Sequence, residues 1–137
     1  MPELRKDPVL GRWIIISKER SKRPTDFLIE KAETIGGFCP LCPGHEGNTP
    51  SEVFAFRNDV NSKKDSPGWQ VRVVPNKFPA LVIEGDLDKE AEGLYDKMNG
   101  IGAHEVIIES PDHDVDFAYL PIDEMALVFK AYKHRIE

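Results

Sequence analysis

The stretch FCPLCPGHEG, residues 38–47, constrains this chain more than any other, because it holds both of its cysteines. Cys39 and Cys42 stand at C-x-x-C spacing, and the prolines and Gly44 around them favour a tight turn. Two thiolates presented by such a turn can bind one tetrahedral zinc ion, which needs two further donors. A redox pair of the thioredoxin type opens a helix, whereas the following PGHEGNTPSE does not fit one.

The chain's histidines are the natural source of further ligands. His113, in SPDHD, follows the clearest predicted strand at a turn that could aim it sideways, and His104 begins that strand. His45 is close to Cys42 along the chain, whereas His134 falls in a predicted helix and is expected at the surface. The residues alone therefore leave the histidine ligand open.

Length and charge limit the class of protein. A chain of 137 residues is long enough for one domain with a real core. Its formal net charge of -6 argues against general nucleic-acid binding. The first residues are charged and interrupted by proline, and no run approaches the ~18 apolar residues of a membrane span. We therefore expect a cytoplasmic protein with reduced thiols and with neither a nucleic-acid nor a membrane partner.

Short alternating or β-branched runs predict strands at 12–17, 51–57, 69–76 and 103–110, the first of them buried. A short helix is expected within 86–100, although Gly93 weakens it. From Pro121 the pattern becomes helical. The expected apolar face consists of Met125, Val128, Phe129, Tyr132 and Ile136. These elements predict an α+β fold, with helices packed on an antiparallel sheet.

Two further segments could contact a ligand. Arg20 and Arg23 follow the first predicted strand, and arginine forks pair well with phosphate oxygens. In VPNKFPAL, the amide of Asn76 could bind a base edge and Phe78 could form an apolar wall. Taken singly, the arginine segment fits a solvated basic loop better, and VPNKFPAL fits an ordinary strand end better.

In order, ELRKDPVLGRWIIIS, CPLCPG, NKFPAL and GAHEVIIESPDH resemble the galactose-1-phosphate uridylyltransferase family, and also plant ADP-glucose phosphorylases. The resemblance runs from about Glu3 to Ile136. It implies a histidine-triad-like α+β fold of the histidine-triad superfamily, in which residues 1–137 form an incomplete N-terminal domain. They would be the truncated first of two repeats.

The resemblance implies two sets of site residues. The zinc ligands would be Cys39, Cys42 and His113. The residues that contact the nucleotide would be Arg20, Arg23, Asn76, Phe78 and Val106. The fourth ligand and the nucleophilic histidine would come from a His-x-His motif, which residues 1–137 do not contain, so the catalytic histidine is expected beyond residue 137.

The implied activity is UDP-glucose–hexose-1-phosphate uridylyltransfer in galactose metabolism. A histidine would take UMP from UDP-glucose and pass it to a hexose 1-phosphate in a ping-pong reaction, within a homodimer. Lys77 stands where some uridylyltransferases have an Asp that can hold ribose hydroxyls, which leaves the choice of nucleotide open. An ADP-sugar phosphorylase is one alternative. A non-catalytic zinc-knuckle module that binds nucleotides is another, and these 137 residues alone are expected to be inactive.

Overall fold

The computed structural model describes residues 1–18, 20 and 37–137. The chain divides into two compact units, and each is described by itself. The first unit contains Met1–Glu33 and Phe78–His104, and the second contains Thr34–Lys77 and Glu105–Glu137.

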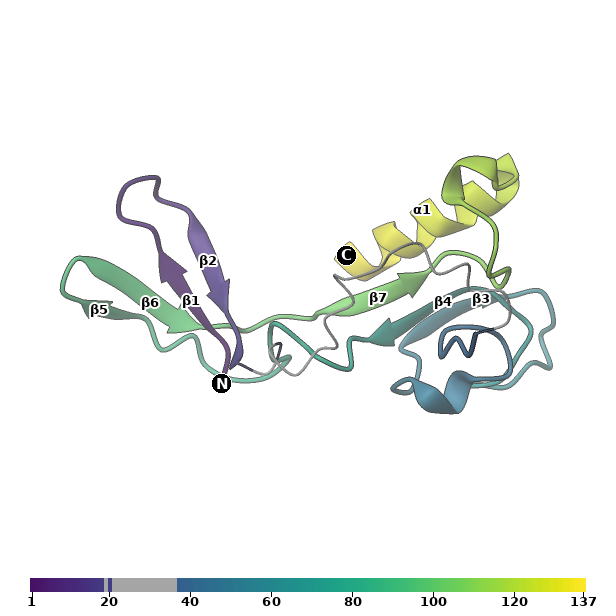
Figure 1. Ribbon diagram of the computed structural model, residues 1–137, viewed down its shortest axis with the longest axis horizontal. Helices are drawn as coiled ribbons and strands as arrows, with labels where there is room; N and C mark the ends of the chain where they lie inside the picture. Colours follow the sequence, from purple (N-terminus) through teal and green to yellow (C-terminus); the bar gives the residue numbers. More distant parts are fainter. Residues whose placement is uncertain (19, 21–36) are drawn as a thin grey trace. The chain divides into compact units, whose positions relative to one another are not determined.

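The first unit is a four-stranded antiparallel sheet made of two hairpins (Figure 1). Its strands are β1 (Glu3–Lys6), β2 (Trp13–Ile16), β5 (Glu90–Glu92) and β6 (Tyr95–Asn99), in the order β2-β1-β6-β5. The pairing of β1 with β6 joins the hairpins, and Leu4 lies opposite Ile15 on one side and Met98 on the other.

Two expectations for this unit are wrong. The segment expected to form a helix within 86–100 forms the β5–β6 hairpin, with Gly93 at a φ of +64°. Glycine adopts this left-handed backbone conformation without strain, which suits a tight hairpin turn. The strand conformation also lets β6 pair with β1, which a helix could not do. The strand expected at 12–17 is confirmed as β2 but is not buried. It is an edge strand, and Ile14 is 52% exposed.

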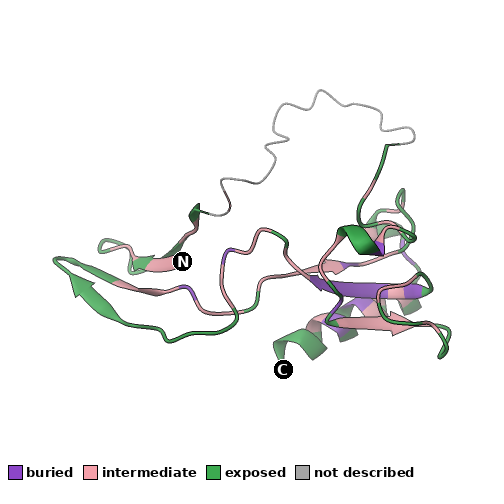
Figure 2. Cartoon of the chain, turned by 90° about the horizontal axis from the view of Figure 1, so that it is seen from below, coloured by how far each residue is buried: buried purple, intermediate pink, exposed green. Residues whose placement is uncertain are grey.

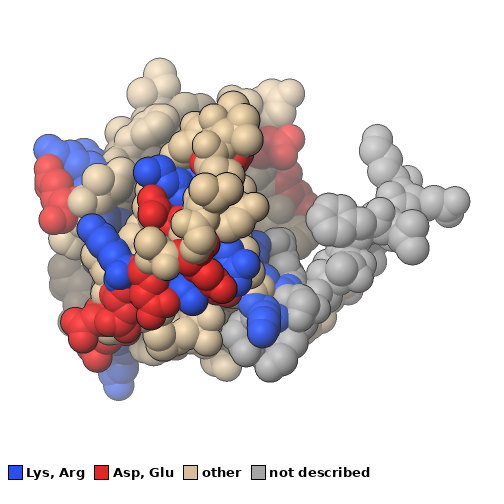
Figure 3. Space-filling model, turned by 90° about the vertical axis from the view of Figure 1, so that its left-hand side faces the viewer, with Lys and Arg blue, Asp and Glu red and all other residues tan. Residues whose placement is uncertain are grey.

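Charged side chains on this sheet pair locally. Figure 3 shows Lys and Arg interleaved with Asp and Glu on the face that it presents. Lys97 contacts Glu90 at 3.1 Å and Glu92 at 3.3 Å, and Lys6 contacts Asp96 at 3.5 Å. Exposed pairs of this kind contribute only about 0–1 kcal/mol each, so they do little to hold the sheet together.

The second unit is a three-stranded antiparallel sheet with one α-helix packed on it. It consists of β3 (Phe54–Arg57), β4 (Trp69–Pro75), β7 (Glu105–Ile108) and α1 (Ile122–Ile136), with the short 3-10 turns η2 (Glu46–Asn48) and η3 (Phe117–Tyr119). The strands expected at 51–57, 69–76 and 103–110 are confirmed. The central strand β4 carries most of the buried residues of its sheet (Figure 2).

The core lies on both faces of β4. Val71 and Val73 pack with Leu120, Val128 and Ala131 on the side of the helix. A second cluster, on the strands themselves, contains Trp69, Val74 and Ile108, and Val106 packs against it.

The helix expected after Pro121 is confirmed, but its buried face differs from the expected one. Val128 and Ala131 are fully buried, whereas Phe129 is 57% and Ile136 85% exposed. A single helix on a three-stranded sheet buries a narrow stripe, so residues at the edge of its apolar side stay in water. The α+β class is therefore correct, but with two sheets and, among the described residues, one α-helix. No helix in the described ranges is both long and apolar enough to cross a bilayer.

Candidate metal centre

Three side chains with soft or borderline donor atoms meet at one place in the second unit. The thiols of Cys39 and Cys42 and the ring of His113 offer donor atoms that all lie within 4.8 Å of one another. Cys42 Sγ lies 3.3 Å from His113 Nδ1. The cysteines precede η2 and the histidine follows β7, so 71 residues of chain separate two neighbouring donors.

The cysteine turn is closed by its own backbone. The Cys42 amide donates to the Cys39 carbonyl at 3.4 Å, and the His45 amide donates to the Cys42 carbonyl at 3.1 Å. Gly44 has a φ of +90°, a conformation that glycine adopts without strain. This hydrogen-bonded turn points both thiols to the same side.

The other histidines have different surroundings. His45 Nδ1 lies 2.7 Å from the Cys39 carbonyl, and since a carbonyl only accepts, this nitrogen carries the proton. The ring of His45 is not part of the three-donor group. His104 belongs to the first unit, where its Nδ1 accepts from the Ala80 amide at 2.9 Å. His134 is exposed and its ring lies 4.3 Å from that of Phe54.

The three-donor group fits a zinc-sized tetrahedral ion. Bonds of about 2.3 Å to sulfur and about 2.0 Å to nitrogen place ligand atoms roughly 3.5–3.8 Å apart. Two thiolates and an imidazole also match the preference of zinc among biological metals. Burial raises the pKa of the Cys42 thiol, and the hydrogen bond and charge of Cys39 add to this. A bound cation would oppose that shift by favouring the thiolate.

Glu46 connects the cysteine turn to the sheet. Its side chain is buried, with Oε2 accepting from the Gly44 amide and Oε1 accepting from the Trp69 indole, both at 2.9 Å. Its carbonyl accepts from the Thr49 hydroxyl at 2.9 Å. The turn is thereby attached to the first residue of β4.

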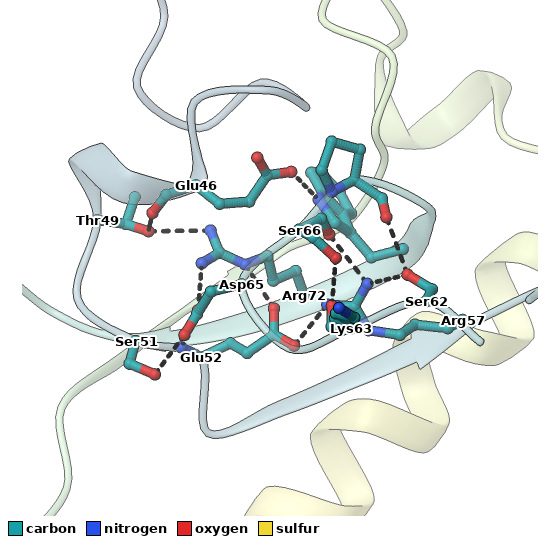
Figure 4. A network of polar contacts seen from close by, with 12 residues as sticks. Glu46, Thr49, Ser51, Glu52, Arg57, Ser62, Lys63, Asp65, Ser66 and Arg72 are labelled. Atoms are coloured by element: carbon teal, nitrogen blue, oxygen red, sulfur yellow. Dashed lines mark hydrogen bonds and ion pairs between the residues drawn. The ribbon is translucent and has the colours of Figure 1, made fainter. Parts of the chain in front are cut away.

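A buried ionic network continues from Thr49 across the sheet (Figure 4). Arg72, on β4, is fully buried and donates to Glu52 at 2.8 Å, to Thr49 at 2.9 Å and to Asp65 at 3.0 Å. Glu52 also accepts from Arg57 at 2.5 Å. Each charge in this network therefore faces a partner of opposite sign, as buried charges require.

The network lowers one pKa strongly. Burial alone raises the pKa of the Asp65 carboxyl, but hydrogen bonds from Ser51, the Glu52 amide and Arg72, with the charge of Arg72, lower it to about 2. The carboxylate is therefore held ionised, and it fixes the loop that precedes β4.

The predicted nucleotide residues are divided between the units. In the first unit, Arg20 lines a hollow of about 410 Å³ together with Ala80 and His104, and Phe78 is half-buried. In the second unit, Asn76 directly follows β4. Arg23 lies outside the described residues.

Val106 lies opposite Val74 and packs into the Trp69 cluster. Its position there is that of a core residue. A role beside a nucleoside stays a prediction for all five of these residues.

The sequence motifs did not predict the network of polar side chains that connects the cysteine turn to the sheet. Its members are Glu46, Thr49, Glu52, Arg57, Asp65, Trp69 and Arg72. Glu46 and Trp69 are 23 residues apart, and no local pattern announces their contact. The one available signal was the charged Arg72 between two valines in the run WQVRVVP.

Comparison with known proteins identifies the family. Residues 1–137 match the family described as galactose-1-phosphate uridyl transferase, N-terminal domain. The chain therefore belongs to this family of nucleotidyltransferases, as the ordered motifs predicted.

Two relatives and two solved structures are informative. ADP-glucose phosphorylase from Arabidopsis thaliana is 36% identical over 98% of this chain and 38% of its own length. Galactose-1-phosphate uridylyltransferase from Haemophilus influenzae is 26% identical over 98% of this chain and 37% of its own length.

A uridylyltransferase structure matches with a TM-score of 0.58 and 28% identity, covering 94% of this chain and 32% of that one. The crystal structure of the Arabidopsis thaliana ADP-glucose phosphorylase with bound ADP-glucose matches with a TM-score of 0.51 and 35% identity, covering 99% and 37%. The chain thus spans less than two fifths of the length of these relatives.

Proposed function

We propose that these residues are the N-terminal part of an enzyme that transfers a nucleoside monophosphate from a nucleotide sugar through a nucleotidyl-histidine. The observation that carries the proposal is the meeting of Cys39 and Cys42 with His113, which lies 71 residues after Cys42; the family motifs had picked out all three. Family membership supplies the reaction class.

Zinc is the metal proposed for this centre, with Cys39, Cys42 and His113 as three of its ligands. When bound, it supplies a structural crosslink between the cysteine turn and the loop after β7. The fourth ligand is proposed to be the first histidine of a His-x-His motif, which residues 1–137 do not contain. Since structural zinc contributes folding free energy, the stability of the second unit should depend on metal.

The nucleotide is proposed to contact five residues. Arg20 and Arg23 would pair with phosphate oxygens through charge-assisted hydrogen bonds. Asn76, Phe78 and Val106 would contact the nucleoside. The attacking histidine is proposed to lie outside residues 1–137, which hold no His-x-His pair.

Two nucleotide sugars are candidate donors. The motifs placed UDP-glucose first, with a hexose 1-phosphate as acceptor. The higher identity to an ADP-glucose phosphorylase, 36% against 26% for a uridylyltransferase, favours ADP-glucose with phosphate as acceptor. The TM-scores of 0.51 and 0.58 fall in the opposite order, but the identity compares side chains, which choose the base, so we rank ADP-glucose first.

An exchange assay tests the proposal and separates the donors. The whole gene product should exchange labelled glucose 1-phosphate into one nucleotide sugar without an acceptor, as a covalent intermediate requires. Exchange into ADP-glucose supports the first candidate, and exchange into UDP-glucose supports the second. Nucleotide binding without exchange into either would favour the non-catalytic module and contradict the enzyme.

Two variants test the nucleotide residues. Arg23→Ala should weaken binding of the phosphates by about tenfold or more, because a hydrogen bond to a charged group contributes about 1.5–3 kcal/mol. Phe78→Ala should weaken nucleoside binding. If both variants keep the parent affinity and turnover, the nucleotide binds elsewhere. Sedimentation of the whole protein would test the expected homodimer.

Elemental analysis tests the metal independently of activity. Freshly purified protein should contain zinc, and Cys39→Ser should lower both zinc content and thermal stability. His134→Ala is the control, since this exposed histidine lies outside the three-donor group. Protein without zinc, in which both thiols titrate freely, would contradict the proposed centre.

A further inference from the structure

The carboxylate of Glu46 occupies an unusual position for a charged group. It is only 5% exposed, and no arginine, lysine or histidine within residues 1–18, 20 and 37–137 pairs with it. Its two oxygens instead accept from two neutral donors, the Gly44 amide and the Trp69 indole, each at 2.9 Å. A charge this buried is costly unless its hydrogen bonds are made, so the site is built to hold it.

The two donors belong to different parts of the unit. Gly44 lies two residues after Cys42, inside the left-handed turn that closes the cysteine loop. Trp69 begins β4 and is itself 3% exposed. Glu46 therefore connects the thiol-bearing turn to β4, the most buried of the described strands.

We propose that Glu46 is a positioning residue of the metal centre, whose buried carboxylate holds the Cys39–Cys42 turn against Trp69 in the geometry that binds metal. This inference rests on the metal site proposed above. Outer-shell residues of metal sites generally raise metal affinity, because their hydrogen bonds fix the orientation of the ligands before the metal binds.

The chemistry of the site requires a carboxylate. Both neighbours are donors, so the residue between them must accept twice. Glutamine has the same size but offers one accepting oxygen and one NH₂ group. Its NH₂ group would therefore face either the Gly44 amide N–H or the Trp69 indole N–H, and neither of these can accept a hydrogen bond. Glu46→Gln should therefore loosen the turn with little change in volume.

Metal affinity of folded protein is the measurement. Zn²⁺ is titrated against a chelator of known affinity with the parent and Glu46→Gln, after circular dichroism confirms the fold. Glu46→Gln should bind Zn²⁺ tenfold to a hundredfold more weakly, the range typical for residues behind metal ligands. Glu105→Gln is the matched control, because it changes a half-buried carboxylate that pairs with Arg135, away from the cysteine turn. Its affinity should stay within twofold of the parent.

Trp69 gives a second readout. In a Trp13→Phe background it is the only indole in the chain, so its emission reports the Glu46 contact. Zn²⁺ should shift this emission in the Trp13→Phe protein, and Glu46→Gln in the same background should need tenfold to a hundredfold more Zn²⁺ for the same shift. Replacing both members of the pair, in Glu46→Gln with Trp69→Phe, should cost less affinity than the sum of the single changes, because the clash of donors is removed.

Each outcome has a definite meaning. Parent protein that binds no Zn²⁺ overturns the metal site and this inference with it. Parent protein that binds Zn²⁺ while a folded Glu46→Gln binds it equally well overturns the inference alone. If Glu46→Gln does not fold, Trp69→Phe decides, because it removes one of the two donors. A severalfold weaker Zn²⁺ affinity then supports the proposal, and an unchanged affinity overturns it.

Discussion

Arg72 should contribute more to the stability of this protein than any surface charge, and Arg72→Met tests this. The side chain is fully buried and makes three hydrogen bonds of 2.8–3.0 Å to Glu52, Thr49 and Asp65. Methionine fills a similar volume without the charge. The change therefore leaves the Glu52 carboxylate, which is 6% exposed, without its buried partner on β4.

The loss of stability in Arg72→Met depends on which partners Glu52 and Asp65 keep. Removing one partner of a buried ion pair typically costs about 3–5 kcal/mol. Glu52 still accepts from Arg57, and the Asp65 side chain is 32% exposed, so water can replace part of what Arg72 gave. We therefore expect the lower end, a loss of about 3 kcal/mol in the free energy of unfolding. That is a large share of the ~5–15 kcal/mol that stabilises a typical domain.

Urea unfolding followed by circular dichroism measures this loss. With slopes of about 1–3 kcal/mol per M, the midpoint should fall by roughly 1–3 M. Arg135→Met is the control, because its two bonds to Glu105, at 2.7 and 2.8 Å, lie near the surface and should be worth at most about 1 kcal/mol. An Arg72→Met variant within 1 kcal/mol of the parent, or no worse than Arg135→Met, would refute the reasoning.

Three further predictions concern pH and packing. The pKa of Asp65 is lowered to about 2 in the folded state, so its contribution to the free energy of unfolding is present above about pH 4 and is lost as pH falls toward 2. Unfolding measured across this pH range should show the loss in the parent and not in Asp65→Asn. The hydrogen bond from Tyr132 to Glu109, with burial, raises the pKa of Tyr132 to about 12. Its contribution to the free energy of unfolding is therefore complete below about pH 10 and is lost between about pH 10 and 12. In alkaline unfolding curves, Tyr132→Phe should abolish that loss. Val128→Ala should cost about 2–3 kcal/mol in urea unfolding because the site is fully buried, whereas Ile136→Ala should stay within about 0.5 kcal/mol; equal effects would contradict the buried face assigned to α1.

Local periodicity was enough to predict much of the second unit. The alternation in WQVRVVP and AHEVIIES marked β4 and β7, and the spacing after Pro121 marked α1. The same rules failed for the segment of β5 and β6. Its alternation is weak, and its strand conformation depends on pairing with β1, about 90 residues away. Propensity favoured a helix there, and tertiary pairing overrode it.

The metal centre shows a similar division. The spacing of Cys39 and Cys42 pointed to a metal, but spacing could not choose among four histidines. His113 was selected by its place in a family motif, and the structure places its ring beside Cys42. Glu46 was not selected at all, because a glutamate in a polar loop has the same sequence signature whether it is exposed or buried.

Strand β4 explains why the missed residues matter. Its alternate side chains serve different purposes, since Val71 and Val73 pack toward α1 while Arg72 binds Glu52 and Asp65. Strand β4 therefore contributes both to the hydrophobic core and to the polar contacts of Arg72 and Trp69, which hold the loop that follows the cysteine turn. An arginine in the middle of a buried strand costs stability unless every bond is made. Arg72 meets this requirement through Glu52, Thr49 and Asp65, so the strand keeps its charge at the point where these loop residues need a donor.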